Sequence, residues 1–168
     1  VKQLTTGIAQ LFKANGVTHI KGTAKLLANK TVTVTTEAGE EIFYQANHIV
    51  LAAGSSPIEI PAAKIDGERI IDSTGALDLT AAPKRLGIIG AGVIGLELGS
   101  VYQRLGTQVS VIEFMDKIIP TMDDDMGKEL QRSLKKLGMK FYLSHKVTGA
   151  VNNGDSVTVS ALDKKEQE

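Results

Sequence analysis

The chain has 168 residues, of which 42% are hydrophobic and 23% are charged, and its formal net charge is zero. This length is enough for one well-packed domain or two small ones, and the neutral balance gives no reason to expect nucleic acid or a membrane surface as a partner. No apolar run approaches the length of a membrane span, and the absence of cysteine excludes disulfides, thiolate metal sites and thiol chemistry within these residues.

The first part of the chain predicts a helix followed by a small antiparallel meander. Leu4, Ile8 and Leu11 are spaced as on one face of a helix, which predicts a helix over residues 1–12. Alternating and apolar runs then predict short strands, at residues 17–20, 24–27, 31–35 and 41–44.

A buried apolar strand is predicted over residues 48–53, and the small residues Gly54 and Ser55 follow it. Small residues at the carboxyl end of a strand let a flat ligand or a phosphate approach the backbone. A proline-containing connection comes next, with a short helix predicted at residues 73–79. The boundary between two domains is predicted near residues 80–84.

From Arg85 onward the pattern alternates between strand and helix, as in half of a doubly wound α/β domain. The predicted strands are 85–89, 107–113 and 140–143, and the predicted helices are 93–105 and 126–137. An antiparallel pair is predicted after them, at residues 146–151 and 156–162. A sheet of this type usually contains further parallel strands, so the second domain is expected to be incomplete at its C-terminus.

The turn between the first of these strands and its helix contains Gly90, Gly92 and Gly95 in the spacing Gly-x-Gly-x-x-Gly. Gly90 permits the tight turn, Gly92 lets the backbone approach a pyrophosphate, and Gly95 lets the helix pack closely on the strands. The helix then offers free N–H groups and a positive dipole end to the phosphates. The pattern predicts a Rossmann-type dinucleotide site; the alternative is a strand–turn–helix unit that binds nothing.

Glu113 ends the next predicted strand, 23 residues after Gly90, close to the spacing that the dinucleotide motif requires. An acid at this position accepts hydrogen bonds from the adenosine ribose hydroxyls and repels the 2′-phosphate of NADP. Lys117 is the only base between Phe114 and Asp125. The sequence therefore predicts NAD rather than NADP, the alternative being an acid that is merely solvated at a strand end.

No catalytic cluster and no metal site is predicted. His19, His48 and His145 show no ligand spacing. The acidic run Asp123–Asp125 directly precedes the helix predicted at 126–137, and acids at this position satisfy helix N-terminal N–H groups. The run is therefore predicted to cap that helix rather than to bind a metal.

Similarity to a known family extends through runs along the whole chain, at residues 4–8, 11–13, 19–22, 73–77, 90–101, 103–106, 113–114 and 146–149. In these runs the chain resembles the middle of the dihydrolipoyl dehydrogenases, a family of FAD- and NAD-dependent disulfide oxidoreductases. The block 90–101 together with Glu113 is typical of pyridine nucleotide-disulfide reductases in general. The longer similarity points to the lipoamide branch.

The resemblance implies a later part of an FAD-binding domain in residues 1–79 and most of an NAD-binding domain in residues 80–168. It implies NAD contacts at Gly90, Ala91, Gly92, Val93, Ile94, Gly95, Glu97, Glu113 and Val147. It implies FAD contacts at Gly22, Thr23, Ala24, Ala52, Ala53, Gly54 and Ser55. Ala53 stands where the family usually has threonine, and the family places the residue matching Glu97 close to the flavin and nicotinamide rings.

The resemblance also implies oxidation of dihydrolipoamide by NAD through FAD. The family's redox-active Cys-x4-Cys pair, upstream flavin fingerprint and His–Glu acid–base pair are absent from these residues, so the segment is expected to be inactive alone and to contain no catalytic residue. For the parent protein it implies a homodimer and the lipoyl-bearing E2 component of 2-oxo acid dehydrogenase complexes as partner. It implies the bacterial cytoplasm or the mitochondrial matrix as location.

Two alternatives remain open at this point. One is another flavin reductase of the same superfamily, such as a transhydrogenase or a mercuric-type reductase. The other is a non-catalytic dinucleotide-binding module. The predicted elements stop abruptly at both ends of the chain, which counts against that module, because a unit that stands alone is expected to cover its sheet edges. Exposed edges also predict self-association of the isolated chain.

Overall fold

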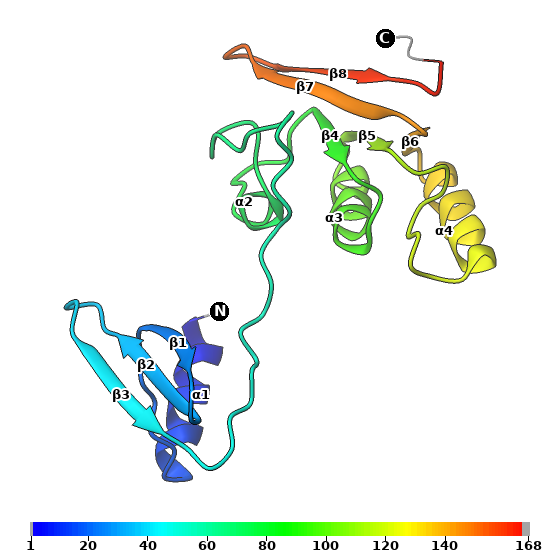
Figure 1. The fold of residues 1–168 in the computed structure, drawn as a ribbon. Coiled ribbons are helices and arrows are strands. Elements are labelled where there is room, and N and C mark those ends of the chain that lie inside the picture. The colour runs from blue at the N-terminus through cyan, green and yellow to red at the C-terminus, as the bar shows by residue number, and fades with distance from the viewer. Residues whose placement is uncertain (1, 166–168) are drawn as a thin grey trace. The chain divides into compact units, whose positions relative to one another are not determined.

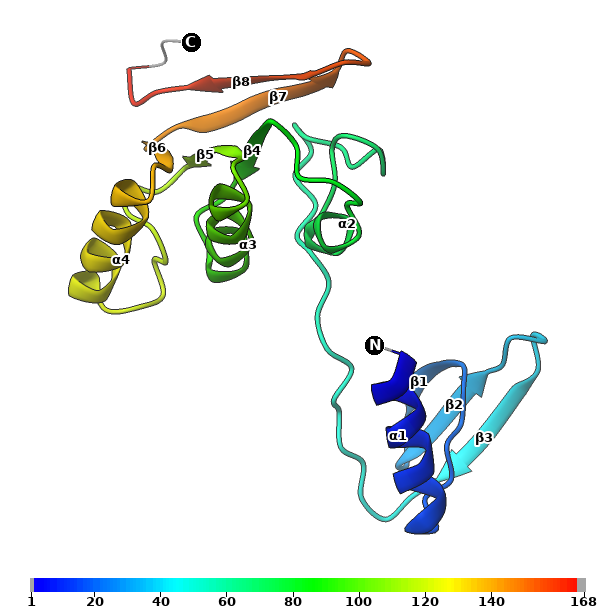
Figure 2. The same ribbon diagram turned by 180° about the vertical axis from the view of Figure 1, so that it is seen from behind.

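The computed structural model describes residues 2–165, and the chain forms two compact units, Val1–Gly54 and Ser55–Glu168. We call these the N-terminal unit and the C-terminal unit and describe each by itself. Figure 1 and Figure 2 show their helices and strands from opposite sides. Within residues 2–165, no helix is both long enough and apolar enough to cross a membrane.

The N-terminal unit contains one helix and an antiparallel meander, as predicted. The elements are α1 (Lys2–Ala14), β1 (Thr23–Leu27), β2 (Thr31–Thr35) and β3 (Glu41–Gln45), and the strands pair in the order β1-β2-β3. Asn29 and Lys30 both have a φ of 55° in the turn between β1 and β2. A hydrogen bond from Thr31 N to Ala28 O closes this turn. Two consecutive positive φ values are the mark of the type I′ turn that suits a two-strand hairpin.

Two predicted strands of this region are wrong. Residues 17–20 and 48–53 are not in strands, and Val50 and Leu51 are 87% and 75% exposed. Alone, an apolar run does not make a strand, because the backbone N–H and C=O groups of a strand must pair with a neighbouring strand. In the described part of the chain, no segment pairs with either run. Ala52, Ala53, Gly54 and Ser55 therefore lie in an exposed segment without regular secondary structure rather than at the end of a buried strand.

The C-terminal unit is built on a parallel sheet. Its strands are β4 (Arg85–Ile89), β5 (Gln108–Glu113) and β6 (Lys140–Leu143), which pair in that order. The helices are α2 (Ser73–Leu77), α3 (Val93–Arg104) and α4 (Asp124–Lys136). The predicted strand–helix alternation, and with it the α/β fold class, is confirmed.

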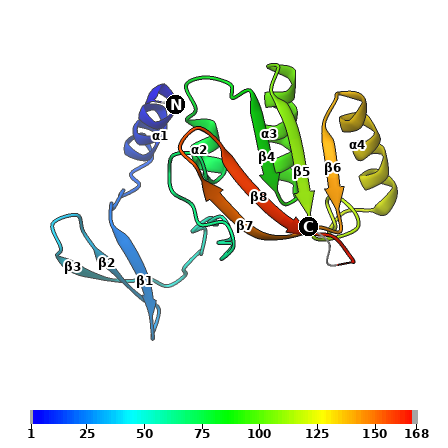
Figure 3. The ribbon, with the colours of Figure 1, turned by 90° about the horizontal axis from the view of Figure 1, so that it is seen from above.

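An antiparallel hairpin covers one face of this sheet. It consists of β7 (Lys146–Asn152) and β8 (Val157–Leu162), and Figure 3 shows it on the side of the sheet opposite α3 and α4. The register shifts between Val147 and Gly149, so β7 contains a bulge with one residue, Thr148, that has no partner in β8. The predicted turn at 152–155 is confirmed, with Asn153 N donating to Ser156 O over 2.8 Å.

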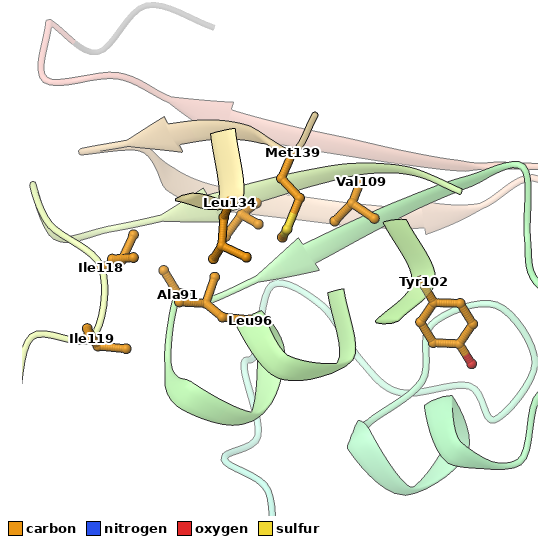
Figure 4. Close-up of a cluster of buried hydrophobic side chains, with 9 residues drawn as sticks. Ala91, Leu96, Tyr102, Val109, Ile118, Ile119, Leu134 and Met139 are labelled. Atoms are coloured by element: carbon orange, nitrogen blue, oxygen red, sulfur yellow. The ribbon is translucent and has the colours of Figure 1, made fainter. Parts of the chain in front are cut away.

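The main hydrophobic core of the C-terminal unit lies between the sheet and its two long helices (Figure 4). Its members are Ala91, Leu96, Tyr102, Val109, Val111, Ile118, Ile119, Leu134 and Met139. Burying a large apolar side chain contributes about 1.5–3 kcal/mol. Helix α3 approaches the sheet closely: a Cβ added at Gly99 would lie 2.6 Å from Ile88 Cδ1. This packing fixes the start of α3 at the carboxyl end of β4.

Candidate functional site

The glycine turn between β4 and α3 is open on the side where a ligand would bind. Gly90 has a φ of +99°, and its N–H donates to Ile112 O on β5 over 2.8 Å. Gly92 is the N-cap of α3, with a φ of −74° and no side-chain hydrogen bond that caps the helix. A Cβ added at Gly90 or Gly92 would meet no atom within 4 Å. The turn therefore leaves free space directly above the helix N-terminus.

The third glycine of the turn has a different role. A Cβ added at Gly95 would lie 3.0 Å from Ile88 Cγ2 and 3.1 Å from Gly90 O. Gly95 thus permits close contact between α3 and β4, as the sequence predicts. The N–H groups of the first helical turn, at Val93, Ile94 and Gly95, have no partner inside an α-helix and point out of its positive end. Phosphate groups bind at such a terminus.

Ala91 lies between the two open glycines and is fully buried. Its N–H donates to Glu113 Oε2 over 2.6 Å, and its C=O accepts from Ile119 N–H over 2.9 Å. Both sides of the Ala91 backbone are therefore occupied by partners from outside the turn. The Ala91 N–H is not free to donate to a phosphate in this arrangement, whereas Gly92 N–H has no partner within residues 2–165.

Glu113 is a nearly buried carboxylate at the carboxyl end of β5, 9% exposed. Besides Ala91 N–H, it accepts a hydrogen bond from Met115 N–H at Oε1, over 2.7 Å. Among residues 2–165 it forms no ion pair. The one nearby base that the sequence offers, Lys117, lies 2.5 Å from Asp124 instead. That hydrogen bond and the opposite charge raise the pKa of Lys117 and lower the pKa of Asp124.

The acidic run at 123–125 forms the N-cap and the start of α4, which confirms the predicted capping role. Asp123 is the N-cap residue, and its Oδ1 accepts from Asp125 N–H over 2.9 Å. Asp125 itself lies 3.0 Å from Lys128. Within the part of the chain that the structure describes, no group of three or more His, Cys, Asp or Glu side chains is placed to hold a metal ion.

Comparison with known proteins agrees with this geometry. The profile of the pyridine nucleotide-disulphide oxidoreductases matches residues 1–168. The chain belongs to this family.

Relatives within the pyridine nucleotide-disulphide oxidoreductases are close in sequence and longer than this chain. Dihydrolipoyl dehydrogenase 3 of Pseudomonas putida is 52% identical over 159 residues, which cover 95% of this chain and 34% of that protein. Leghemoglobin reductase of Glycine max is 48% identical over 160 residues, covering 95% of this chain and 31% of that protein. The crystal structure of LpdA from Mycobacterium tuberculosis superposes with a TM-score of 0.85 at 26% identity, covering 99% of this chain and 37% of that one. The chain thus spans about a third of the length of the curated relatives it matches.

The remaining residues assigned to NAD lie farther along the C-terminal unit. Glu97 is an exposed residue in the second turn of α3, and Val147 is half-buried in β7 beside the bulge. Within residues 2–165, no hydrogen bond links Glu97 to Val147. Their contacts with a dinucleotide stay predictions.

The residues assigned to FAD are all exposed. Gly22 is in addition constrained by the atoms around it. A Cβ added at Gly22 would overlap Thr35 O and lie 2.7 Å from Val34 Cγ1, so this glycine permits close approach to β2 whatever it binds. Thr23 and Ala24 begin β1, opposite Thr35 and Val34. Ala52, Ala53, Gly54 and Ser55 make no hydrogen bond with each other. Their contacts with a flavin also stay predictions.

Sequence reasoning missed the residues that hold the turn from outside. Ile119 has a φ of +39°, an uncommon conformation for a β-branched residue, and its backbone N–H holds Ala91. Met115 contributes only its backbone N–H to Glu113. Neither role depends on a side-chain type, so no pattern of residue types signals them.

Proposed function

We propose that this chain is the central segment of a dihydrolipoyl dehydrogenase and that its C-terminal unit binds NAD. The observation that carries the proposal is the open turn at Gly90 and Gly92, with the carboxylate of Glu113 at the end of the adjoining strand. The 52% identity to a dihydrolipoyl dehydrogenase of Pseudomonas putida supports the lipoamide branch.

In this proposal the pyrophosphate lies over the N-terminus of α3. The N–H groups of Gly92, Val93 and Ile94 donate to its oxygens, and the positive end of the helix stabilises its charge. Glu113 accepts hydrogen bonds from the adenosine ribose hydroxyls. A 2′-phosphate would instead meet a carboxylate that has no cation beside it, which favours NAD over NADP.

The flavin part of the proposal rests on the family alone. FAD supplies the hydride-transfer chemistry in such enzymes, and the protein supplies binding and orientation. We assign residues 22–24 and 52–55 to one wall of the flavin site, and Glu97 and Val147 to the nicotinamide end. Residues 1–79 then belong to the FAD-binding domain and residues 80–168 to the NAD-binding domain.

For the parent protein we propose a homodimer, a lipoyl-bearing E2 partner, and the bacterial cytoplasm or the mitochondrial matrix. The catalytic thiols and the acid–base pair lie outside these residues. The segment by itself is therefore expected to bind NAD and to lack dihydrolipoamide dehydrogenase activity.

The test is titration of the full chain with NADH and NADPH, followed by nicotinamide fluorescence. We expect saturable NADH binding that is at least about tenfold tighter than NADPH binding. With NADPH, a charge-assisted hydrogen bond from the ribose to Glu113 is replaced by repulsion between the carboxylate and the 2′-phosphate. Equal affinities, or no binding of NADH, would contradict the proposal.

A glycine pair provides the matched variants for this titration. Gly92→Ala places a methyl group in the free space above the helix, at backbone angles that any residue adopts, so we expect the fold to be kept and NADH affinity to fall. Gly7→Ala makes the same chemical change on α1, where the added Cβ also meets no atom within 4 Å. NADH affinity is expected to be unchanged in the Gly7 variant.

A further inference from the structure

The backbone of Ala91 is held from two sides by the segment that follows β5. Glu113 Oε2 accepts from its N–H over 2.6 Å, and Ile119 N–H donates to its C=O over 2.9 Å. Gly90 and Gly92 flank Ala91 and have no side chains that could fix the turn by packing. Together with the Gly90 N–H, which donates to Ile112 O over 2.8 Å, the two hydrogen bonds at Ala91 set where the neighbouring Gly92 N–H points.

We propose that Glu113 is a positioning residue for the pyrophosphate as well as the acceptor for the ribose. Its carboxylate orders the glycine turn before any ligand arrives, so that the N–H groups at Gly92 and Val93 already point at the phosphate position. The inference rests on the proposed NAD function. It adds that one side chain contributes to the recognition of two different parts of the dinucleotide.

The acceptor capacity of the carboxylate allows both roles at once. An ionised carboxylate has two oxygens with about four lone-pair sites, and it donates no hydrogen bond. Ala91 N–H occupies one site on Oε2, and Met115 N–H occupies one site on Oε1. One site on each oxygen remains, which matches the two hydroxyls of a ribose diol.

The second link to Ala91 is held in place by packing. Ile119 keeps a φ of +39° while its side chain is buried in the core with Ile118, and Figure 4 shows both beside Ala91 and Leu96. A sparsely populated backbone conformation persists only where the surroundings enforce it, and such residues cluster at ligand sites. The enforced conformation aims the Ile119 N–H at the turn.

Glu113→Gln separates the two roles. Glutamine has the same shape, but one of its two terminal atoms is a donor, so either Ala91 N–H or Met115 N–H loses its acceptor and faces another N–H. The matched control is Asp116→Asn, which removes a negative charge from the same segment. Asp116 is exposed and makes no hydrogen bond to the turn in the described residues.

The experiment measures the dissociation constants of ADP and adenosine for the full chain and for both variants, by calorimetry or ligand-observed NMR. The ratio of the adenosine constant to the ADP constant reports what the phosphates add to binding. We expect this ratio to fall by on the order of tenfold in Glu113→Gln and to stay unchanged in Asp116→Asn. Partial unfolding would weaken both ligands by the same factor and would leave the ratio unchanged.

Two results would overturn the inference and leave the NAD function standing. One is a ratio that is unchanged in both Glu113→Gln and Glu113→Ala, although adenosine binds more weakly and both variants keep the circular dichroism spectrum of the wild-type chain, because Glu113 would then serve the ribose alone. The other is rapid hydrogen exchange at the Ala91 amide of the ligand-free wild-type chain, as fast as at Gly92, because the turn would then not be ordered in advance. Absence of ADP and NADH binding to the wild-type chain would instead refute the proposed function itself, and the inference with it.

Discussion

Asn152 Nδ2 donates a hydrogen bond of 2.8 Å to Asp66 Oδ2, a residue that precedes it by 86 positions. The other carboxylate oxygen of Asp66 accepts from the backbone N–H groups of Glu68, Arg69 and Ile70. One carboxylate therefore closes its own turn and ties that turn to the end of β7. The connection between the two regions is made by polar groups at the surface rather than by the hydrophobic core.

The pH dependence of stability is expected to reflect Asp66. Hydrogen bonds from backbone N–H groups lower the pKa of Asp66 from 3.8 to about 2; the bond from Glu68 has the largest effect and the bond from Ile70 the next largest. Because the pKa of the folded state is depressed, the contribution to stability is complete above pH 3.8 and is lost as the pH falls toward 2. We expect the difference in unfolding midpoint between wild type and Asp66→Asn to shrink over that interval. A difference that stays constant from pH 5 to pH 2 would argue against this role.

Removal of one hydroxyl is expected to loosen the contact between α2 and α3. The Tyr102 hydroxyl donates to Ala76 O, and Tyr102 is buried. Tyr102→Phe is expected to reduce the free energy of unfolding by about 1 kcal/mol, measured by urea denaturation. Tyr142→Phe is the control, because that side chain is 44% exposed and its hydroxyl has no partner among the described residues. Equal losses in the two variants would contradict the assigned contact.

Gly22 is expected to contribute to the stability of the N-terminal unit. Gly22→Ala would drive a methyl group into Thr35 O, a backbone atom that cannot move without shifting β2. We expect destabilisation of about 1–3 kcal/mol by chemical denaturation. Gly7→Ala, in the middle of α1, is expected to stabilise by up to about 1 kcal/mol because alanine favours the helix. Gly22→Ala with wild-type stability would show that the meander has room for the methyl group.

The preference for NADH over NADPH is expected to decrease when Glu113, the acid at the end of β5, is replaced. Glu113→Ala eliminates the ribose acceptor and the charge that repels a 2′-phosphate, so NADH binding is expected to weaken by about 1 kcal/mol or somewhat more. NADPH binding is expected to weaken less or to improve. Fluorescence titration with both nucleotides measures this, and an unchanged NADH affinity would remove Glu113 from the site.

Self-association is expected through the exposed apolar segment after β3. Val50 and Leu51 are 87% and 75% exposed, and exposed apolar side chains that lie next to each other favour association. The double variant Val50→Lys with Leu51→Lys is expected to shift the chain toward monomer in sedimentation velocity. Phe114→Lys, which replaces another exposed apolar residue with the same charge, is the comparison. A wild-type chain that is monomeric at all concentrations would refute the expectation.

The elements that the sequence predicted well are those that local periodicity determines. Strands β2, β4 and β6 have the predicted bounds, and α3 begins at the predicted residue, whereas α4 begins two residues earlier than predicted, at Asp124. The runs at 17–20 and 48–53 misled because strand formation needs a partner strand, which apolar composition alone does not supply. In the candidate site, the positions of Gly90, Gly92 and Glu113 followed from motif spacing. The hydrogen bonds of Glu113 to Ala91 and Met115 depend on one side-chain rotamer and two backbone groups, which no spacing encodes.

The bulge at Thr148 lets β7 accommodate one extra residue without a change of face. Val147 and Gly149, on either side of the bulge, pair with the consecutive β8 residues Ala161 and Ser160. Directly paired residues of an antiparallel sheet point to the same face, so removal of Thr148 would leave residues 149–152 opposite the same β8 residues and Asn152 within reach of Asp66. A second deletion in β7 would exceed the one extra residue and would shift the register, so that Asn152 no longer lies opposite Val157. Within this hairpin, loss of one residue from β7 is accordingly expected to be tolerated, and loss of two is not.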